Sequence, residues 1–190
     1  MPTDKEYTGA LMVEIRPMAY EDYSSVVNLW HEGWHHAHAH LVPKEVLTFR
    51  TKKYFWRWLD QSKGTFWIAA DNDLLGFVST NGSELVKLYV SAEARGKGVA
   101  AALLTHGEQE ISANGFIQAV LFCTAGNSRA ERFYKRQKWV LDHTFLDKLW
   151  LPKRAIGQFP VDTHCYKKAL VSSDVSTSKN PIEQGGTHVI

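Results

Sequence analysis

The chain has 190 residues, of which 44% are hydrophobic and 22% charged, and its formal net charge is +2. This composition is typical of one globular domain, and the charge is too small to suggest a nucleic-acid or membrane-surface partner. Two cysteines, Cys123 and Cys165, give neither a disulfide framework nor a metal-ligand cluster. They suit a reducing cytosol, and we find no membrane span or signal-peptide pattern. We therefore expect a cytoplasmic protein without nucleic-acid or membrane partners.

Apolar periodicity and turn signals predict a mixed sheet covered by helices in one domain over 11–170. Residues 1–10 and 171–190 are predicted to be flexible termini, since Ser, Thr, Asn, Pro and Gly dominate the second segment. In chain order, the predicted elements are strand 11–16, helices 21–34 and 43–58, strands 66–70, 74–79 and 84–90, a helix ending at 114–115, strand 119–123, a helix starting at Asn127, and strands near 139–146 and 162–169.

A glycine-punctuated loop connects the strand at 84–90 to an alanine- and leucine-rich helix. Glycines let successive backbone N–H groups converge on one point, and the following helix directs its unpaired N–H groups and positive dipole end to the same point. Two cationic side chains add formal charge. The loop residues are Arg95, Gly96, Lys97, Gly98, Val99 and Ala100. Together these features predict a binding loop for a diphosphate.

Two kinds of diphosphate ligand fit this loop. Gly96, Gly98 and Ala101 satisfy a dinucleotide fingerprint, but that motif needs an acidic residue about 20 positions later to bind the ribose. The window 116–123 contains no Asp or Glu, and the loop lies in the middle of the chain. The dinucleotide interpretation is therefore disfavoured. The alternative pattern is an arginine followed by glycine and alanine, at positions 95, 98 and 100.

A second motif lies beyond the strand at 119–123. Asn127 is a good helix N-cap, and Ala130, Phe133 and Tyr134 follow along one helix face. The two motifs, in this order, resemble those of the GNAT superfamily of N-acetyltransferases over roughly residues 13 to 169. The resemblance implies an α/β (α+β) GNAT fold, with a mostly antiparallel sheet of about seven strands, about four helices, and splayed strands at the coenzyme site.

The resemblance also implies acetyl-CoA as co-substrate. The loop residues 95–100 would bind its diphosphate, and Asn127, Ala130 and Tyr134 would lie beside the coenzyme. The edge of the preceding strand would bind the pantetheine arm through backbone groups of Leu88, Tyr89 and Val90. The family usually has glycine shortly after this tyrosine, ahead of an aromatic residue. Here Lys138 precedes Trp139, so we expect Lys138 to be strained if that turn needs a positive φ.

Two residues are candidates for the catalytic chemistry. Glu84 starts the strand eleven residues before Arg95, a separation that matches the glutamate base of histone-acetylating GNAT members. Strict alternation would place Glu84 on one face with Val86, Leu88 and Val90. A solvent-exposed glutamate at a strand start is the alternative interpretation. Tyr134 is the candidate acid for the leaving thiolate, because a phenol stays protonated at neutral pH. A structural tyrosine in the core is its alternative.

A run of histidines precedes the second predicted helix. His31, His35, His36, His38 and His40 include pairs at i,i+4 spacing, which could bind a metal ion. We expect no metal, because neither cysteine lies near the run and Glu32 alone accompanies it. One or two of these histidines lining the acceptor pocket is more plausible than a metal site, and a solvated, merely polar turn is the commonest outcome for such a run. The segment 34–47 also resembles one found in small-molecule GNAT acetyltransferases.

We therefore expect an acetyl-CoA-dependent N-acetyltransferase that acts on a primary amine of a small molecule or peptide. A catalytically silent acyl-CoA-binding sensor or scaffold is the alternative. The acidic residues Glu32, Glu45 and Asp142 are available to attract a cationic amine, but the sequence does not place them. The aromatic content is compatible with a homodimer.

Overall fold

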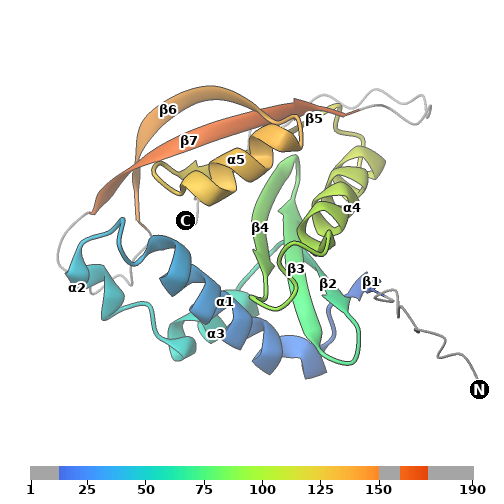
Figure 1. Cartoon of the computed structure of the whole chain (residues 1–190), viewed down its shortest axis with the longest axis horizontal. Helices are drawn as coiled ribbons and strands as arrows, with labels where there is room; N and C mark the ends of the chain where they lie inside the picture. Colours follow the sequence, from blue (N-terminus) through green and yellow to red (C-terminus); the bar gives the residue numbers. More distant parts are fainter. Residues whose placement is uncertain (1–12, 150–158, 171–190) are drawn as a thin grey trace, which may run out of the picture.

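The computed structural model describes residues 13–149 and 159–170 of the chain. Seven strands and five α-helices follow one another along these residues (Figure 1). The helices are α1 Tyr23–His38, α2 Lys44–Leu47, α3 Lys52–Asp60, α4 Val99–Ala113 and α5 Ser128–Arg136, with a 3-10 turn at Tyr20–Asp22 before α1. The strands are β1 Glu14–Pro17, β2 Thr65–Ala70, β3 Leu74–Asn81, β4 Glu84–Val90, β5 Gln118–Thr124, β6 Val140–Lys148 and β7 Pro160–Ala169.

The strands form one sheet in the order β1-β2-β3-β4-β5-β7-β6. All neighbours are antiparallel except β4 and β5, which are parallel. That pair is joined at one register position, Glu84 opposite Val120, where the Val120 N–H donates to the Ser83 carbonyl at 3.0 Å. Beyond this position the two strands are unpaired, so the sheet consists of a β1–β4 half and a β5–β7 half.

Helices cover both faces of the β1–β4 half. Ile68 and Phe77 belong to an apolar cluster with α1 and α3, whereas their neighbours Ala69 and Val78 belong to a second cluster with α4. This division follows from the alternation of side chains along each strand. Removal of such large apolar side chains from water stabilises the fold by about 1.5–3 kcal/mol for each one. The sheet is therefore held rigid on both sides up to the point where its halves part.

A polar contact from α4 connects the two halves across this division. The Glu108 carboxylate accepts hydrogen bonds from Trp139 Nε1 at 2.8 Å and from Lys168 Nζ at 2.7 Å. Trp139 precedes β6, and Lys168 lies in β7. The position of the second half relative to the first is thus set by side chains of α4 rather than by a continuous ladder.

The predicted fold class and the hairpin of β2 and β3 are confirmed, but the single helix predicted over 43–58 is wrong. The chain forms α2 and α3 with a break between them, which is why there are five helices in the described residues. Thr51 causes the break, because its backbone is extended and its hydroxyl accepts from the Tyr54 N–H as an N-cap. The predicted flexible termini lie outside the described residues, as do residues 11 and 12 of the first predicted strand. Within 13–149 and 159–170, no helix has the length and apolar character needed to cross a membrane.

Lys138 ends α5 in a left-handed conformation, with φ of 65°. The turn is closed by the Lys138 N–H, which donates to the Lys135 carbonyl at 3.1 Å, and by the Trp139 N–H, which donates to the Tyr134 carbonyl at 3.0 Å. Glycine usually occupies such a helix C-terminal position. The lysine therefore carries backbone strain of about 1 kcal/mol, as its place in the sequence predicts.

Replacing this lysine with glycine should stabilise the protein. We expect Lys138→Gly to raise the free energy of unfolding by about 0.5–1 kcal/mol, because glycine adopts a positive φ without a Cβ clash. Denaturant titration followed by tryptophan fluorescence measures the change. Lys135→Gly, inside α5, is the matched control and should lower the free energy of unfolding by about 1 kcal/mol. Equal destabilisation by both substitutions would show that Lys138 is unstrained.

Candidate active site

The edge of β4 that faces β5 is open over its second half. Leu88, Tyr89 and Val90 pair with β3 on their other side, and they have no register partner in β5. Peptide groups of an unpaired edge point into the gap and can bond an extended molecule as an added strand. The structure therefore leaves these three residues available for the backbone contacts that we predict.

The loop 91–98 closes one end of this gap. Gly96 and Gly98 have φ of 76° and 84°, and, apart from the adjacent residues, no atom of the described part of the chain lies within 4 Å of a Cβ built at either position. Gly98 is the N-cap of α4, so the N–H groups of the first helical turn have no intrahelical acceptor. Ala94 and Val99 are buried and anchor the loop, whereas Arg95 and Lys97 are exposed. The loop presents backbone donors and two cations to open space.

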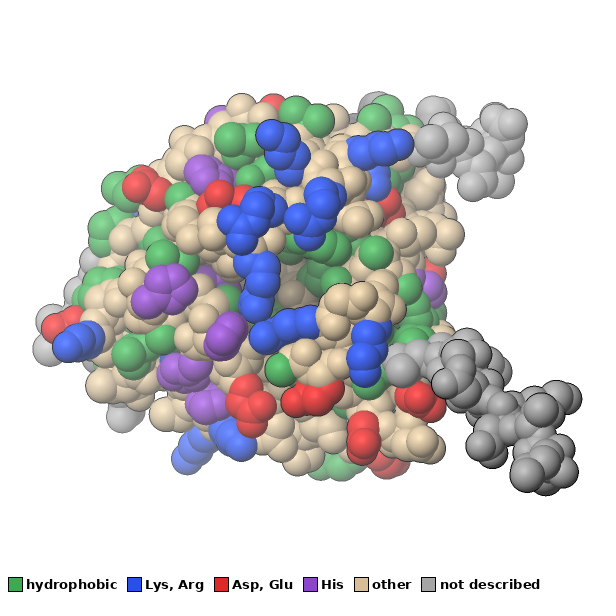
Figure 2. Space-filling view, in the orientation of Figure 1, with side chains coloured by type: hydrophobic (Ala, Val, Ile, Leu, Met, Phe, Trp, Pro, Cys, Tyr) green, Lys and Arg blue, Asp and Glu red, His purple; other side chains and the backbone are tan. Residues whose placement is uncertain are grey.

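Arg129 joins this loop from the other half of the sheet. It lies in the first turn of α5, where partial burial and the positive charge of Arg95 both lower its pKa. Figure 2 shows Lys and Arg side chains bordering a hollow between α5 and the loop before α4. Two cations held close despite their repulsion indicate a binding site for an anion. Sequence reasoning missed Arg129, although it lies between Asn127 and Ala130 of the second motif.

Helix α5 brings the remaining predicted residues to the gap. The Asn127 side chain accepts from the Ala130 N–H at 3.3 Å, so Asn127 is the N-cap as predicted. Burial raises the pKa of the Tyr134 phenol, and nearby Cys123 and Tyr89 raise it further. Since Cys123 belongs to β5 and Tyr89 to β4, these interactions place Tyr134 close to both strands where they diverge.

Glu84 occupies a different face from the one that simple alternation predicts. In the β3–β4 ladder, Ser79 pairs with Lys87, Thr80 with Leu85 and Asn81 with Glu84, so Val86 is an extra residue in β4. Such a bulge shifts the side-chain alternation by one residue. The predicted grouping of Glu84 with Val86, Leu88 and Val90 is therefore wrong. Glu84 shares its face with Lys87 and Tyr89, on the side covered by α1 and α3.

An aromatic cage with a buried arginine lies on that side. Arg50 is only 1% exposed, its Nη1 donates to the Tyr54 hydroxyl at 3.2 Å, and its guanidinium carbon lies 5.0 Å from the Trp34 ring centroid. The same guanidinium lies 5.8 Å from the ring of Trp58. We define the aromatic cage as Trp30, Trp34, Tyr54 and Trp58. Ring faces stabilise a cation that is removed from water.

Lys87 reaches the same cage from β4. Its Nζ lies 5.3 Å from the Trp58 ring centroid and 5.8 Å from that of Trp30, and it donates to the Val86 carbonyl at 3.2 Å. Burial lowers the pKa of Lys87 to about 7, with Glu84 opposing and Arg50 adding to the shift. Sequence reasoning missed both cations, because a lysine in a strand and an arginine between helices normally face water.

The histidine run lies mainly on α1, because this helix continues to residue 38. The predicted helix ends at residue 34, so the expectation that the run forms the connection between the first two helices is wrong for most of it. His38 is buried and donates through Nδ1 to the Trp34 carbonyl at 3.1 Å, and burial lowers its pKa to about 4. His35 Nε2 donates to the Arg50 carbonyl at 2.7 Å. His36 and His40 border a small cavity of about 110 Å³ beside Asn127. These contacts give two of the histidines structural partners.

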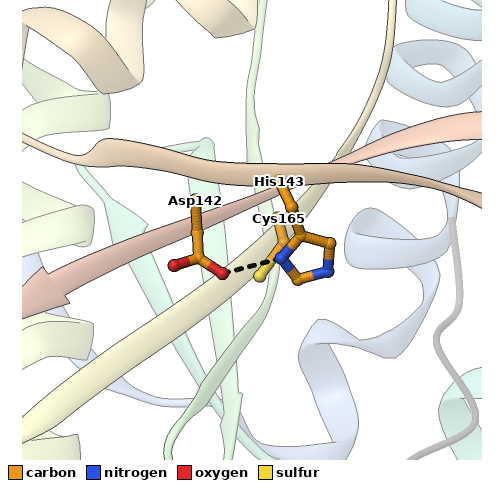
Figure 3. Close-up of side chains that lie close together, drawn as sticks. All are labelled: Asp142, His143 and Cys165. Carbon is orange, nitrogen blue, oxygen red and sulfur yellow. Dashed lines mark hydrogen bonds and ion pairs between the residues drawn. The ribbon is translucent and has the colours of Figure 1, made fainter.

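Asp142 now has a position that the sequence could not supply. Its Oδ2 lies 2.7 Å from His143 Nδ1 and 3.0 Å from Lys167 Nζ, and Cys165 lies next to them (Figure 3). Ligand atoms of Asp142, His143 and Cys165 all lie within 4.8 Å of one another, a spacing that could hold a metal ion. The Lys167 ammonium already occupies one side of the carboxylate. Burial raises the pKa of the Cys165 thiol, and the negative charges of Asp142 and Glu84 raise it further. The interaction with Glu84 shows that the group of Asp142, His143 and Cys165 lies near the candidate base.

Comparison with known proteins agrees with this arrangement. Residues 23–139 match the acetyltransferase (GNAT) family. The chain is 25% identical over 151 residues to a spermidine N(1)-acetyltransferase from Thermoplasma acidophilum, covering 70% of this chain and 92% of that protein. The chain therefore belongs to the GNAT acetyltransferase family.

Solved structures share the fold. A GCN5-related N-acetyltransferase from Rhodopseudomonas palustris has a TM-score of 0.65 and 17% identity, covering 83% of this chain and 95% of its own. The PaiA N-acetyltransferase from Thermoplasma acidophilum, solved in complex with coenzyme A, has a TM-score of 0.56 and 21% identity, covering 80% and 97%. The mixed sheet with its single parallel pair is thus the GNAT fold.

The paired cations lead to a binding prediction. Arg95→Gln and Arg129→Gln should each weaken coenzyme A binding by about tenfold, equal to ~1.4 kcal/mol, through loss of one charged hydrogen-bond donor to phosphate. Isothermal titration calorimetry with coenzyme A measures the dissociation constants. Arg57→Gln, on the exposed surface of α3, is the control and should leave binding unchanged. Unaltered affinity in Arg129→Gln would remove this residue from the phosphate site.

The burial of Lys87 leads to a pH prediction. Its pKa falls from 10.5 to about 7 on folding, so the unfolded chain binds more protons between these values, and the free energy of unfolding rises with pH through this window. Lys87→Met should flatten that rise in denaturant titrations at pH 7, 8.5 and 10. Lys63→Met, at an exposed position, should keep it. Equal pH slopes in Lys87→Met and the unaltered protein would contradict the burial of a titrating amine.

Proposed function

We propose that the protein is an acetyl-CoA-dependent N-acetyltransferase that transfers the acetyl group directly to a primary amine of a small molecule or peptide within a ternary complex. The observation that carries the proposal is the single register position between β4 and β5. Because the strands pair only there, the backbone edge of β4 is open between the glycine loop and Tyr134. A thioester bound along this edge would lie between a candidate base and a candidate acid. The cytoplasmic location expected from the sequence is part of this proposal.

Binding of the coenzyme has three contributions. The N–H groups of the loop and of the first turn of α4 would bind the diphosphate, with Arg95, Lys97 and Arg129 supplying charge. The open edge at Leu88, Tyr89 and Val90 would bind the pantetheine arm as an added strand. Asn127 and Ala130, at the start of α5, would border the arm on its other side. The family model and a relative solved with coenzyme A support acetyl-CoA as co-substrate.

The acceptor amine must lose a proton before it attacks. An amine with a pKa of about 10.4 is neutral in only about one molecule in 2,500 near pH 7, a deficit of roughly 4–5 kcal/mol. Glu84 would accept this proton, directly or through water. It lies at the point where the strands part, on the face covered by α1 and α3. Desolvation and positioning by the site can offset a barrier of this size.

Tyr134 would return a proton to the departing thiolate. Burial raises the pKa of its phenol, so the hydroxyl carries its proton throughout the neutral range and can donate it. The reaction then balances. Glu84 takes one proton from the ammonium, the neutral nitrogen forms a bond to the acetyl carbon, and the carbon–sulfur bond breaks as sulfur receives the phenol proton. The second nitrogen proton, lost as the amide forms, returns to the Tyr134 oxygen, and Glu84 releases its proton to water.

Of the two acceptor classes proposed, a small-molecule amine has the more direct support. The relative from Thermoplasma acidophilum is named as a spermidine N(1)-acetyltransferase. The sequence of residues 34–47 also resembles a segment of small-molecule GNAT acetyltransferases. A silent acyl-CoA sensor is the alternative that the same coenzyme site allows. Turnover with an amine distinguishes the two.

Thiol release with acetyl-CoA and a panel of primary amines tests the proposal. Acetyl transfer to at least one amine should release coenzyme A as a free thiol. Tyr134→Phe should lower kcat about 100-fold, and Glu84→Gln should lower it about tenfold or more. Both variants should still bind coenzyme A. Tyr20→Phe, with an exposed side chain, is the matched control and should retain full activity.

Two outcomes would contradict the proposal. Tight coenzyme A binding without thiol release for any amine would assign the protein as a sensor. Protection against thermal unfolding by nicotinamide dinucleotides, with none by acetyl-CoA, would return the loop to the dinucleotide interpretation.

A further inference from the structure

Strands β6 and β7 bring three metal-ligand side chains together on one face of the β5–β7 half of the sheet. In their ladder, Leu141 pairs with Tyr166 and His143 pairs with Cys165, so Asp142 is an extra residue in β6. A bulge of this kind re-aims a side chain that would otherwise alternate to the other face. Figure 3 shows the Asp142 carboxylate and the His143 imidazole on the same side of β6, with the Cys165 side chain reaching towards them from β7.

The spacing of the three groups is close to that of zinc ligands. Zinc holds nitrogen, oxygen and sulfur at about 2.0–2.3 Å, which puts these atoms roughly 3.3–3.8 Å from one another in a tetrahedron. Here the ligand atoms all lie within 4.8 Å of one another, and the closest pair, Asp142 Oδ2 and His143 Nδ1, is 2.7 Å apart. Each separation therefore has to change by only about 1 Å for the three atoms to surround one ion.

The exposure of the ligands gives the group an open side and a closed side. Asp142 and His143 are exposed, whereas Cys165 is 3% exposed. Cys165 is also a free cysteine, so no disulfide occupies its sulfur. A cation can therefore approach from solvent past the carboxylate and the imidazole, and the buried sulfur forms the back of the group.

The chemistry of the donors selects the class of metal ion. A thiolate and an imidazole are ligands of zinc, whereas magnesium and calcium take oxygen ligands. The thiolate of Cys165 and the carboxylate of Asp142 together balance the charge of a divalent ion. Three protein ligands leave the fourth tetrahedral position to a water molecule.

The Lys167 ammonium competes for the same carboxylate. Its Nζ lies 3.0 Å from Asp142 Oδ2, and both side chains are 37% exposed. An ion pair that is exposed to this extent contributes little and is weakened by salt. A divalent ion can therefore displace the ammonium, and the lysine should weaken metal binding without preventing it.

We propose that Asp142, His143 and Cys165 bind a zinc ion, with water as the fourth ligand. On binding, the thiol proton passes to water and the sulfur ligates as thiolate. Sequence alone gives no sign of this cluster, because pairing of β6 with β7 and the bulge at Asp142 assemble it. The inference goes beyond the proposed acetyl transfer and does not rest on it, since none of the three residues belongs to the coenzyme loop or to the candidate acid and base.

A cobalt titration of the chelator-treated full chain tests the site. Cobalt(II) substitutes for zinc, and a thiolate ligand gives it a charge-transfer absorption band in the near ultraviolet that nitrogen and oxygen ligands do not give. We expect this band to reach its maximum at about one cobalt per chain, and about one equivalent of zinc to remove it, since zinc sites with thiolate ligands favour zinc over cobalt.

Variants of the ligands identify the atoms that bind. Cys165→Ser should abolish the cobalt band, and His143→Gln should weaken zinc binding in isothermal titration calorimetry by at least about tenfold. Lys167→Gln removes the competing ammonium and should strengthen zinc binding about threefold. Circular dichroism checks that each variant is folded. If Cys165→Ser does not fold, the exposed His143 and Lys167 variants still decide.

Two matched controls exclude other metal ligands. Cys123→Ser removes the second buried cysteine, and His36→Gln removes an exposed histidine of the run on α1. Both should leave the cobalt band unchanged, because neither residue belongs to the proposed site.

The same measurements can overturn the inference. No cobalt band in the unaltered protein, or a band that survives in folded Cys165→Ser, would show that this group binds no zinc. Loss of the band in folded Cys123→Ser would move the thiolate ligand to the other cysteine. Weaker zinc binding in Lys167→Gln would overturn the assignment of Asp142 as a ligand. None of these results would affect the proposed acetyl transfer, which thiol release measures independently.

Discussion

The separation of β4 from β5 is the constraint on which the rest of the site depends. The strands share one register position, Glu84 opposite Val120, so each has backbone groups that the sheet does not satisfy. Buried backbone groups need hydrogen-bond partners, and an open edge between two rigid half-sheets is therefore a binding surface for an extended ligand. The gap is maintained from the sides. Glu108 connects α4 to Trp139 and Lys168 without bridging β4 and β5.

The two sides of this gap have different chemistry. On the α4 and α5 side, the glycine loop and Arg129 assemble donors and positive charge around open space, which suits phosphate groups. On the α1 and α3 side, cations are enclosed by aromatic rings and removed from water. The same residue type therefore serves different purposes. Exposed cations suit an anionic coenzyme, whereas the buried cations are stabilised by the ring faces around them.

Several features were predictable because they depend on short stretches of chain. Asn127 caps α5, Gly96 and Gly98 adopt positive φ before α4, and Lys138 is forced into the left-handed region. Each of these depends on local backbone geometry, which a few neighbouring residues determine. The hairpin of β2 and β3 and the seven strands also follow from period and turn signals. The helix break at Thr51 was missed because apolar spacing continues across it.

By itself, the sequence determined the order of the elements, the diphosphate loop and the second helix motif, because these are local patterns with a short-range physical cause. Tertiary structure alone decided which residues share the site. A one-residue bulge at Val86 moved Glu84 to the face of Lys87, and packing of α1 and α3 enclosed Arg50 and Lys87 among aromatic rings. Arg129 met Arg95 across the parted sheet. Register, burial and contacts between distant segments depend on the whole fold, so no local pattern reports them.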